Sequence, residues 1–219
     1  MSDEFDYDVV QQYLETLVPA RPPELAAMEE YARRHGFPII GPVAGQSCYQ
    51  LARLIGARRV FELGSGYGYS TAWFARAVRE TLAETGQSGG EVHHVVWDEQ
   101  LSQMAREHLA ALGYADLVHY HVSEAVATLR EAKGPFDLIF NDIDKHDYPA
   151  SLPVIAEKLR PGGLLIIDNM LWHGRIFNPD DRDRSTIGVH EATRLLTTDP
   201  QWVVTLLPLR DGLMVAQKR

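Results

Sequence analysis

Acidic and amide side chains follow two apolar runs of the sequence, at the points where buried strands should end. Asp142 comes after the largely apolar run 136–141, and Asp168 and Asn169 come after the run 163–167. Neighbouring strands of a parallel sheet lie about 4.8 Å apart, so these three side chains can converge at one edge. Two carboxylates and a carboxamide form a hard oxygen site suited to Mg²⁺, Mn²⁺ or Ca²⁺. Either aspartate alone is typical of a helix cap or loop acid, but the three together predict a metal site.

A glycine-rich turn, FELGSGYGYS at 61–70, lies between a predicted strand and a predicted helix. Gly64, Gly66 and Gly68 permit a tight turn and a close approach of the backbone to a ligand, and the helix N-terminus offers free N–H groups. The spacing differs from the dinucleotide fingerprint and from the phosphate loop. Glu62, just before the turn, would repel a pyrophosphate and suits a ligand with a positive charge or hydroxyl groups. The alternative is a plain tight turn without a ligand.

The elements that must position these residues alternate from about residue 45. Each predicted strand is a nearly continuous apolar run, which indicates a parallel sheet covered on both faces. The predicted strands are 58–63, 92–97, 116–122, 136–142, 163–168, 202–209 and 212–218. The predicted helices are 8–19, 23–35, 46–55, 70–82, 99–112, 124–132, 148–159 and 189–198. The fold class is therefore doubly wound α/β, in which ligands bind outside the carboxyl ends of the strands.

Only Arg210 and Asp211 separate the last two predicted strands, which indicates an antiparallel hairpin. With 219 residues, the chain is expected to form a single domain, 1–219, with an N-terminal helical cap over about 1–40 and a core over about 41–219. The sequence contains no apolar stretch long enough to span a bilayer, and its acidic N-terminus differs from a signal peptide. We therefore expect a cytoplasmic protein without a membrane partner.

The composition also bears on ligands. The net charge of −9 argues against a broad surface for nucleic acid and suits a cationic ligand or a metal ion. A single cysteine, Cys48, excludes an internal disulfide.

The pattern acidic-x-G-x-G, which begins at Glu62 at the end of the first strand, resembles that of the S-adenosylmethionine-dependent methyltransferases of the Rossmann-like class. The resemblance implies a seven-stranded, mostly parallel sheet with the last strand antiparallel, helices on both faces, and S-adenosyl-L-methionine as cofactor. The second acid of that class, which binds the ribose hydroxyls, has no direct match, because Val96 stands at its place. We take Asp98 as the ribose ligand, with a helix cap as the alternative, and Trp97 as a cover for the adenine or a packing aromatic.

The same resemblance implies a wider set of residues around the cofactor. Its members are Ile40, Gly41, Glu62, Gly64, Ser65, Tyr69, Ser70, Trp97, Asp98, Ser123, Glu124, Ala125 and Asp142.

Two further motifs, D-x-D-K-x-x-Y at 142–148 and G-G-x-x-x-x-D-N-x-x-W-x-G at 162–174, resemble the caffeoyl-CoA and catechol O-methyltransferase family. These are small cation-dependent enzymes, and the resemblance runs from about residue 41 to the C-terminus. It implies that the metal ligands are Asp142, Asp168 and Asn169. It also implies that Lys145 is the general base, whereas the alternative for Lys145 is a solvated partner of a neighbouring aspartate. Asp144 and Asp147 receive no role, and His146 and His173 are expected at the surface or the pocket rim.

The expected activity is therefore divalent-metal-dependent methyl transfer from S-adenosylmethionine to a hydroxyl of a catechol-like or hydroxycinnamoyl-type small molecule. A phenol with a pKa of about 10 is mostly protonated at neutral pH. A cation that holds two neighbouring oxygens would lower that pKa and fix the angle of attack. The alternatives are a tRNA hydroxyuridine O-methyltransferase, which the acidic charge disfavours, and a non-catalytic binding protein.

The acceptor side is expected to involve the polar segment 172–188, which directly follows the predicted metal ligands. We expect a mobile loop over the acceptor with Trp172 as a wall for a planar ring; the alternative is a surface loop without contact to the site. We also expect a homodimer.

Overall fold

Residues 6–219, which the computed structural model describes, form a seven-stranded sheet in the order β3-β2-β1-β4-β5-β7-β6. The strands are β1 Arg59–Leu63, β2 Glu91–Val96, β3 Val118–Val122, β4 Phe136–Asn141, β5 Leu159–Ile167, β6 Trp202–Leu207 and β7 Leu213–Lys218. Strands β1 to β5 pair in parallel, and β7 pairs antiparallel with both β5 and β6. The predicted fold class is confirmed, and so is the antiparallel last strand.

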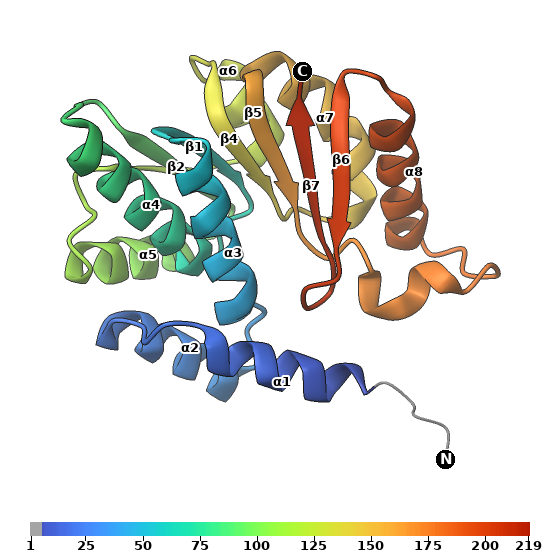
Figure 1. Ribbon diagram of the computed structural model, residues 1–219, viewed down its shortest axis with the longest axis horizontal. Coiled ribbons are helices and arrows are strands. Elements are labelled where there is room, and N and C mark those ends of the chain that lie inside the picture. The colour runs from blue at the N-terminus through green and yellow to red at the C-terminus, as the bar shows by residue number, and fades with distance from the viewer. Residues whose placement is uncertain (1–5) are drawn as a thin grey trace.

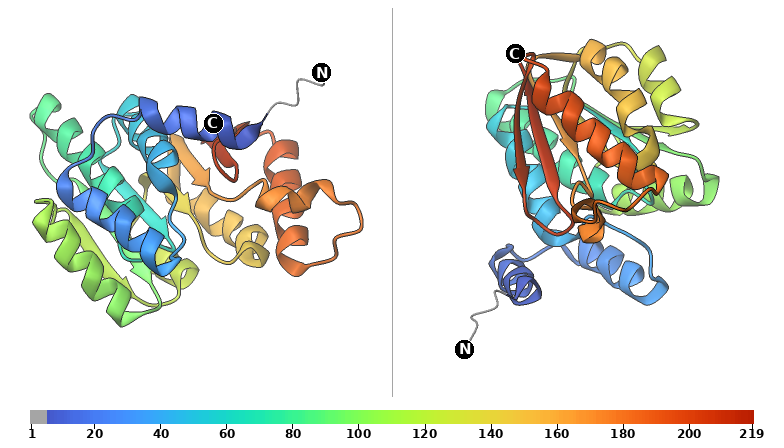
Figure 2. Two further views of the ribbon diagram at one scale, coloured as in Figure 1. Left: turned by 90° about the horizontal axis from the view of Figure 1, so that it is seen from below. Right: turned by 90° about the vertical axis from the view of Figure 1, so that its right-hand side faces the viewer.

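Helices cover both faces of the sheet (Figures 1 and 2). They are α1 Tyr7–Leu17, α2 Pro23–His35, α3 Gly41–Leu54, α4 Tyr69–Thr85, α5 Glu99–Ala111, α6 Ala125–Glu131, α7 Tyr148–Lys158 and α8 Arg184–Thr198, with short 3₁₀ helices η1 Lys145–Asp147 and η2 Trp172–Phe177. One buried apolar cluster joins the sheet to α3, α4 and α5, and a second joins it to α6, α7 and α8. Across residues 6–219, no helix combines the length and the apolar character that a membrane crossing would need.

Successive residues of the central strands pack on opposite faces of the sheet. Val60 and Leu138 belong to the cluster with α3 to α5, while their neighbours Phe61 and Ile139 belong to the cluster with α6 to α8. Because side chains alternate along a strand, a strand covered on both faces needs apolar residues at every position. This is why these strands read as continuous apolar runs in the sequence.

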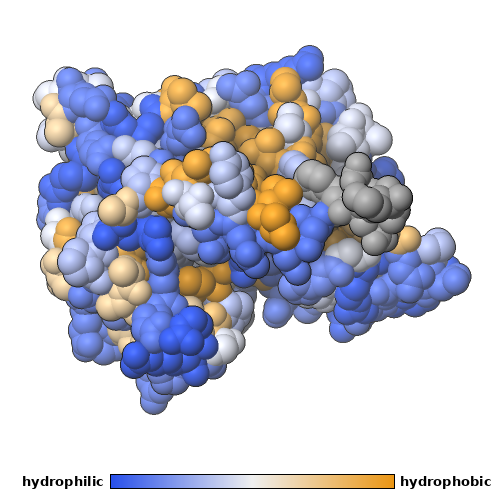
Figure 3. Space-filling model, turned by 60° about the horizontal axis from the view of Figure 1, so that its bottom comes forward, coloured by the Kyte–Doolittle hydropathy of each residue, from blue (hydrophilic) through white to orange (hydrophobic). Residues whose placement is uncertain are grey.

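The two N-terminal helices lie across the edge at which the parallel strands end (Figure 1). Helix α2 buries Leu25, Met28 and Ala32. Within the described part of the chain α1 has no buried residue, and its apolar side chains Tyr13 and Leu17 are exposed. Figure 3 shows apolar side chains gathered in patches on the face that carries these helices.

The largest differences from the sequence-based predictions lie in three parts of the chain. The helix predicted over 46–55 begins at Gly41, where Pro42 favours the first helical turn. The helix predicted over 189–198 begins at Arg184, because the Asp183 side chain accepts a hydrogen bond from the Ser185 N–H (2.9 Å) and caps it. The segment 172–188, predicted as a loop, therefore contains η2 and the first residues of α8. A single 3₁₀ turn has too few residues to show a periodic pattern.

His94 on β2 gives the fold a dependence on pH. The side chain is completely buried beside the Thr71 hydroxyl, and burial lowers the pKa of His94 to about 3. The unfolded chain has the ordinary pKa of about 6.5. Because the folded pKa is the lower one, the stability present above pH 6.5 is lost as the pH falls toward the folded pKa.

We expect His94→Gln to reduce the difference in the free energy of unfolding between pH 7 and pH 5 by about 2 kcal/mol. Urea denaturation at the two pH values measures this difference. His190→Gln, an exposed change on α8, is the matched control. An unaltered pH dependence in the His94 variant would show that this imidazole does not carry the effect.

Candidate active site

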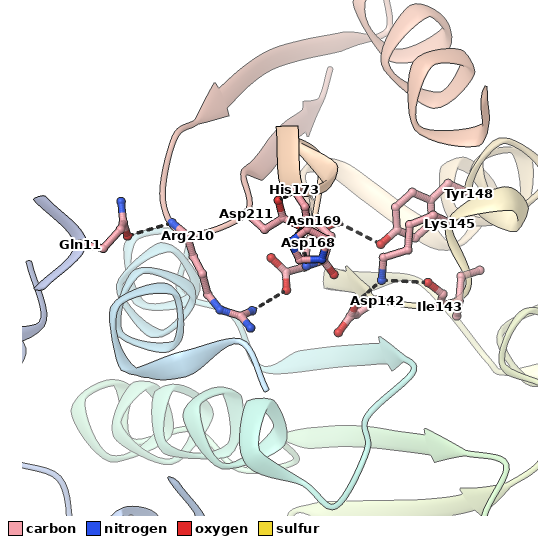
Figure 4. A network of polar contacts seen from close by, with 10 residues as sticks. All are labelled: Gln11, Asp142, Ile143, Lys145, Tyr148, Asp168, Asn169, His173, Arg210 and Asp211. Atoms are coloured by element: carbon pink, nitrogen blue, oxygen red, sulfur yellow. Dashed lines mark hydrogen bonds and ion pairs between the residues drawn. The ribbon is translucent and has the colours of Figure 1, made fainter. Parts of the chain in front are cut away.

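The predicted metal ligands follow two adjacent strands, as the sequence indicated. Asn141 of β4 pairs with Ile167 of β5, and the ladder continues because the Asp168 N–H donates to the Asn141 carbonyl oxygen (3.2 Å). Asp142 and Asp168 therefore leave the sheet side by side (Figure 4). Together with Asn169 they line a cavity of about 610 Å³ at the carboxyl edge of the sheet. The structure thus brings these three side chains to one place.

The two carboxylates are poorly solvated and repel each other. Asp168 is only 1% exposed, whereas the Asp142 side chain keeps 28% of its surface because it faces the cavity. Burial and the neighbouring Asp142 carboxylate raise the pKa of Asp168 to about 7. Burial also raises the pKa of Asp142, although Lys145 opposes the shift. Within residues 6–219, Asp168 Oδ1 has no hydrogen-bond partner. Such an oxygen is costly unless a cation binds it.

Two cationic side chains flank this pair. Lys145 Nζ donates to Asp142 Oδ1 (2.8 Å), and an Arg210 guanidinium nitrogen lies 3.4 Å from Asp168 Oδ2 (Figure 4). The ion pair of Lys145 is thus with Asp142, not with the neighbouring aspartates that the alternative interpretation named. Lys145 Nζ also lies 5.6 Å from the ring centre of Tyr148 and 5.8 Å from that of Trp172.

The set of donors fits a hard divalent cation. In the described part of the chain no three His, Cys, Asp or Glu side chains are grouped to hold a metal ion. A cation held by Asp142 and Asp168 would therefore need a ligand of another type, which the Asn169 amide oxygen could supply. Two carboxylates and one amide leave several positions of a six-coordinate shell to water and substrate oxygens.

The cavity as a whole is acidic. Its lining contains five carboxylates and three cationic side chains, so it carries an excess of negative charge. These residues are Glu124, Asp142, Asp144, Asp147 and Asp168, with Arg130, Lys145 and Arg210. Asp144 and Asp147 are exposed on this wall and contribute to the electrostatic field without a polar contact to the predicted metal ligands. Such a surface favours cationic ligands.

Most of the predicted cofactor residues lie along this cavity or beside it. Trp97, Ser123, Glu124 and Ala125 line the large cavity. A smaller cavity of about 30 Å³ shares part of its wall with the large one and is lined by Ile40, Gly64, Ser65, Tyr69, Ser70 and Asp142. Gly64 has φ +84°, and a Cβ there would meet the Asp142 carbonyl carbon at 2.9 Å, so no side chain fits between them.

Three predicted cofactor residues lie elsewhere. Glu62 is completely buried behind the turn, where the Thr71 hydroxyl donates to it and burial raises the pKa of Glu62 to about 7. Asp98 Oδ1 accepts the N–H groups of Gln100 (2.7 Å) and Leu101 (3.1 Å), so this residue caps α5, which is the alternative stated above. Gly41 begins α3, with φ +69°. Their roles in cofactor binding stay predictions.

Arg210 and Asp211, which the sequence predicts only as a hairpin turn, also belong to the site. Arg210 contacts Asp168, and the Asn169 amide nitrogen lies 3.2 Å from Asp211 Oδ2. Strand β6 runs in the same direction as β1 through β5, so the turn after it lies at the same edge as the predicted metal ligands. This topology is the signal that could have identified both residues.

Gly188 of α8 packs directly against the backbone that carries Lys145. A Cβ at position 188 would overlap the Lys145 carbonyl oxygen and lie 2.7 Å from His146 Cα, so the backbone of η1 would have to shift.

We expect Gly188→Ala to destabilise the fold by about 1 to 3 kcal/mol. Displacement of Lys145 should also lower turnover of the enzyme that is still folded. Chemical denaturation and steady-state kinetics measure the two effects, with His190→Ala on the exposed face of α8 as control. Unchanged values of both would show that η1 adapts freely.

Comparisons with known proteins agree with this geometry. The family model described as O-methyltransferase matches residues 25–219. A putative O-methyltransferase from Mycolicibacterium smegmatis is 30% identical over 192 residues, which cover 88% of this chain and 89% of the relative. A catechol O-methyltransferase from Niastella koreensis is 26% identical over 221 residues, with 96% of each chain covered.

A solved structure is similar along nearly the whole chain as well. The O-methyltransferase TomG from Streptomyces achromogenes, involved in tomaymycin synthesis and solved in complex with SAM, superimposes with a TM-score of 0.83 at 28% identity and 96% coverage of both chains. The family model spans most of the sequence, and the fold and the acidic cavity are consistent with it. The chain therefore belongs to the O-methyltransferase family.

Proposed function

We propose that the protein transfers a methyl group from S-adenosylmethionine to a hydroxyl of a catechol-like or hydroxycinnamoyl-type small molecule, with Mg²⁺ as the assisting cation. The observation that carries this proposal is the buried Asp168, whose Oδ1 has no hydrogen-bond partner within residues 6–219, next to Asp142, Asn169 and Lys145. A buried carboxylate beside a second carboxylate is costly to ionise, and a divalent cation would offset that cost directly.

The large cavity supports the choice of cofactor. Its excess of carboxylates suits the positively charged sulfonium of S-adenosylmethionine. Trp97, whose side chain is 72% exposed at the cavity, offers a face on which the adenine can stack. Asp98 uses only Oδ1 in its cap, so its Oδ2 can accept a hydrogen bond from a ribose hydroxyl.

In this proposal the chain positions the reactants and moves one proton. Asp142, Asp168 and Asn169 would hold the cation, which when bound would supply Lewis-acid chemistry to the acceptor hydroxyl. Lys145 Nζ, after losing its own proton to solvent beside the bound cation, would take the proton from the reacting hydroxyl. Trp172 packs against a planar acceptor, so that the oxygen faces the methyl group in line with the departing sulfur. Positioning of this kind supplies much of the acceleration of a bimolecular reaction.

The deciding experiment uses methyl-labelled S-adenosylmethionine with catechol, a caffeoyl-type acceptor and tRNA, each with and without a chelator. We expect label transfer to the small phenolic acceptors, loss of transfer with chelator, and recovery when Mg²⁺ is added; Mn²⁺ and Ca²⁺ are compared in parallel. Transfer that survives chelation would contradict the metal requirement. Transfer to tRNA alone, with salt-sensitive binding, would favour the hydroxyuridine alternative.

The homodimer is also a proposal. Its support is α1, whose apolar residues Val9, Tyr13 and Leu17 are at least 58% exposed and form a surface that a second copy could cover. Light scattering coupled to size-exclusion chromatography should give twice the chain mass, and a monomer at all concentrations would contradict the proposal.

A further inference from the structure

We infer that Asp211 is a positioning residue, which turns the Asn169 carboxamide so that its oxygen faces the metal-binding carboxylates. This inference rests on the metal site proposed above. It assigns a role to a residue of the β6–β7 turn that does not line the large cavity itself.

The hydrogen-bonding capacity of a carboxylate fixes which end of the amide faces it. Asp211 is 8% exposed, and its Oδ2 lies 3.2 Å from the nitrogen of the Asn169 side chain. An ionised carboxylate only accepts hydrogen bonds, so the atom of Asn169 that faces it must be the NH₂ group. The Asn169 oxygen is therefore directed away from Asp211. Asn169 lines the cavity together with Asp142 and Asp168, so the side of Asn169 that faces away from Asp211 is the side on which a cation would bind.

The second oxygen of Asp211 holds the segment that follows Asn169. Asp211 Oδ1 accepts the N–H of His173 (2.5 Å). Asn169, Trp172 and His173 all have left-handed backbone conformations, with φ of 57°, 47° and 52°. Such conformations cost energy and persist where the surroundings hold them in place. One carboxylate thus fixes both the third metal ligand and the segment that carries Trp172 (Figure 4).

The backbone of the turn is joined to the same segment. The Leu171 N–H donates to the Asp211 carbonyl oxygen (2.7 Å), and the Met170 N–H donates to the Gly212 carbonyl oxygen (3.0 Å). Gly212 has φ +87°, and a Cβ there would lie 2.6 Å from Leu171 Cγ. The close approach that only glycine permits therefore sets the distance between Asp211 and Asn169.

Helix α1 anchors the turn from the other side. The Tyr7 hydroxyl lies 2.6 Å from the Pro208 carbonyl oxygen and 2.9 Å from that of Arg210. The Arg210 N–H donates to Gln11 Oε1 (3.0 Å; Figure 4). Asp211 is thus held between α1 and the metal-ligand segment, as a residue that orients another side chain must be.

Asp211→Asn tests the inference with almost no change of shape. The new carboxamide has a single accepting oxygen, and if that oxygen stays on the His173 N–H, the new NH₂ group faces Asn169. Asn169 then accepts best when its own carboxamide is turned over, which presents NH₂ to the cation. We expect Mn²⁺ affinity, titrated by electron paramagnetic resonance, to fall by about 10- to 100-fold. Affinity for S-adenosylmethionine, measured by calorimetry, should be unchanged.

The double variant Asn169→Asp with Asp211→Asn separates orientation from general damage. It keeps the total charge and restores the donor–acceptor match between the two positions. The carboxylate introduced at position 169 accepts from the NH₂ group introduced at position 211 with one oxygen and keeps the other for the cation. We expect the double variant to regain most of the Mn²⁺ affinity lost by Asp211→Asn. Asp180→Asn, an exposed change between η2 and α8, is the matched control.

The outcomes separate the two proposals. A single variant with wild-type Mn²⁺ affinity, or a double variant no better than the single one, would overturn the role of Asp211 and leave the metal site standing. A wild-type protein that binds no Mn²⁺ would overturn the metal site, and with it the role of Asp211.

Discussion

Replacement of Asp168 by alanine is expected to lower the turnover number by about three orders of magnitude, which corresponds to about 4 kcal/mol of transition-state stabilisation. In the proposed function, the variant loses one of the two carboxylates that would hold the cation. Affinity for S-adenosylmethionine should change far less, since the other four carboxylates of the large cavity remain and Asp168 does not line the smaller cavity at the glycine turn. Steady-state kinetics and calorimetry measure the two quantities.

The Asp168→Ala variant should also differ from the wild type in the response of its thermal stability to Mg²⁺. Asp168 is buried beside a like charge, and its Oδ1 is unpaired within residues 6–219, so alanine removes a costly group from the metal-free protein. The metal-free variant should therefore unfold at the wild-type temperature or above it, whereas added Mg²⁺ should no longer raise that temperature. Asp180→Ala, an exposed change, serves as control. Unchanged turnover, or an unchanged response to Mg²⁺, would remove Asp168 from the site.

Replacement of Lys145 by methionine is expected to lower turnover by about 10²- to 10⁴-fold, the usual contribution of a general base. The Lys145 side chain is 14% exposed, and its Nζ lies at the cavity wall, 2.8 Å from Asp142 Oδ1. Methionine keeps the length of the side chain but has no group that accepts a proton. The Michaelis constant for S-adenosylmethionine should change little.

Lys145→Arg distinguishes proton transfer from simple charge pairing. Arginine preserves the positive charge beside Asp142 but stays protonated throughout the accessible pH range. If Lys145 takes the proton, the arginine variant should be nearly as slow as the methionine variant. If the turnover number of the arginine variant were within about threefold of the wild-type value, the function of Lys145 would be its ion pair with Asp142. The general base would then have to be another group.

The strand ends explain how much of the site could be predicted from the sequence. Asp142 and Asp168 each follow an apolar run, and parallel pairing alone places the ends of such runs together. Asp98 and Glu124 show that residue type and position after a strand do not decide the role of a carboxylate. Asp98 caps α5, and Glu124 accepts the Val126 N–H (2.8 Å) at the start of α6. A carboxylate after a strand can bind a ligand or cap the next helix, and both uses require the same residue type at the same position.

The remainder of the site depends on contacts between distant parts of the chain. Arg210 and Asp211 reach the predicted metal ligands only because β7 inserts between β5 and β6, which no local pattern reveals. The segment 172–188 is polar, but its structure follows from left-handed residues and from the Asp211 carboxylate, not from a periodic pattern. Sequence reasoning therefore located the candidate ligands and missed the side chains that orient them.

The contact between α1 and the β6–β7 turn joins residues that are about 200 positions apart. On a ribosome, the strands that supply Asp142 and Asp168 emerge well before the turn that completes their surroundings. The proposed metal site can therefore reach its final form only after the β6–β7 turn has been synthesised. Helix α1 and the β6–β7 turn then form one unit beside the proposed site, so a change of the chain near Tyr7 should alter the position of Arg210 and Asp211.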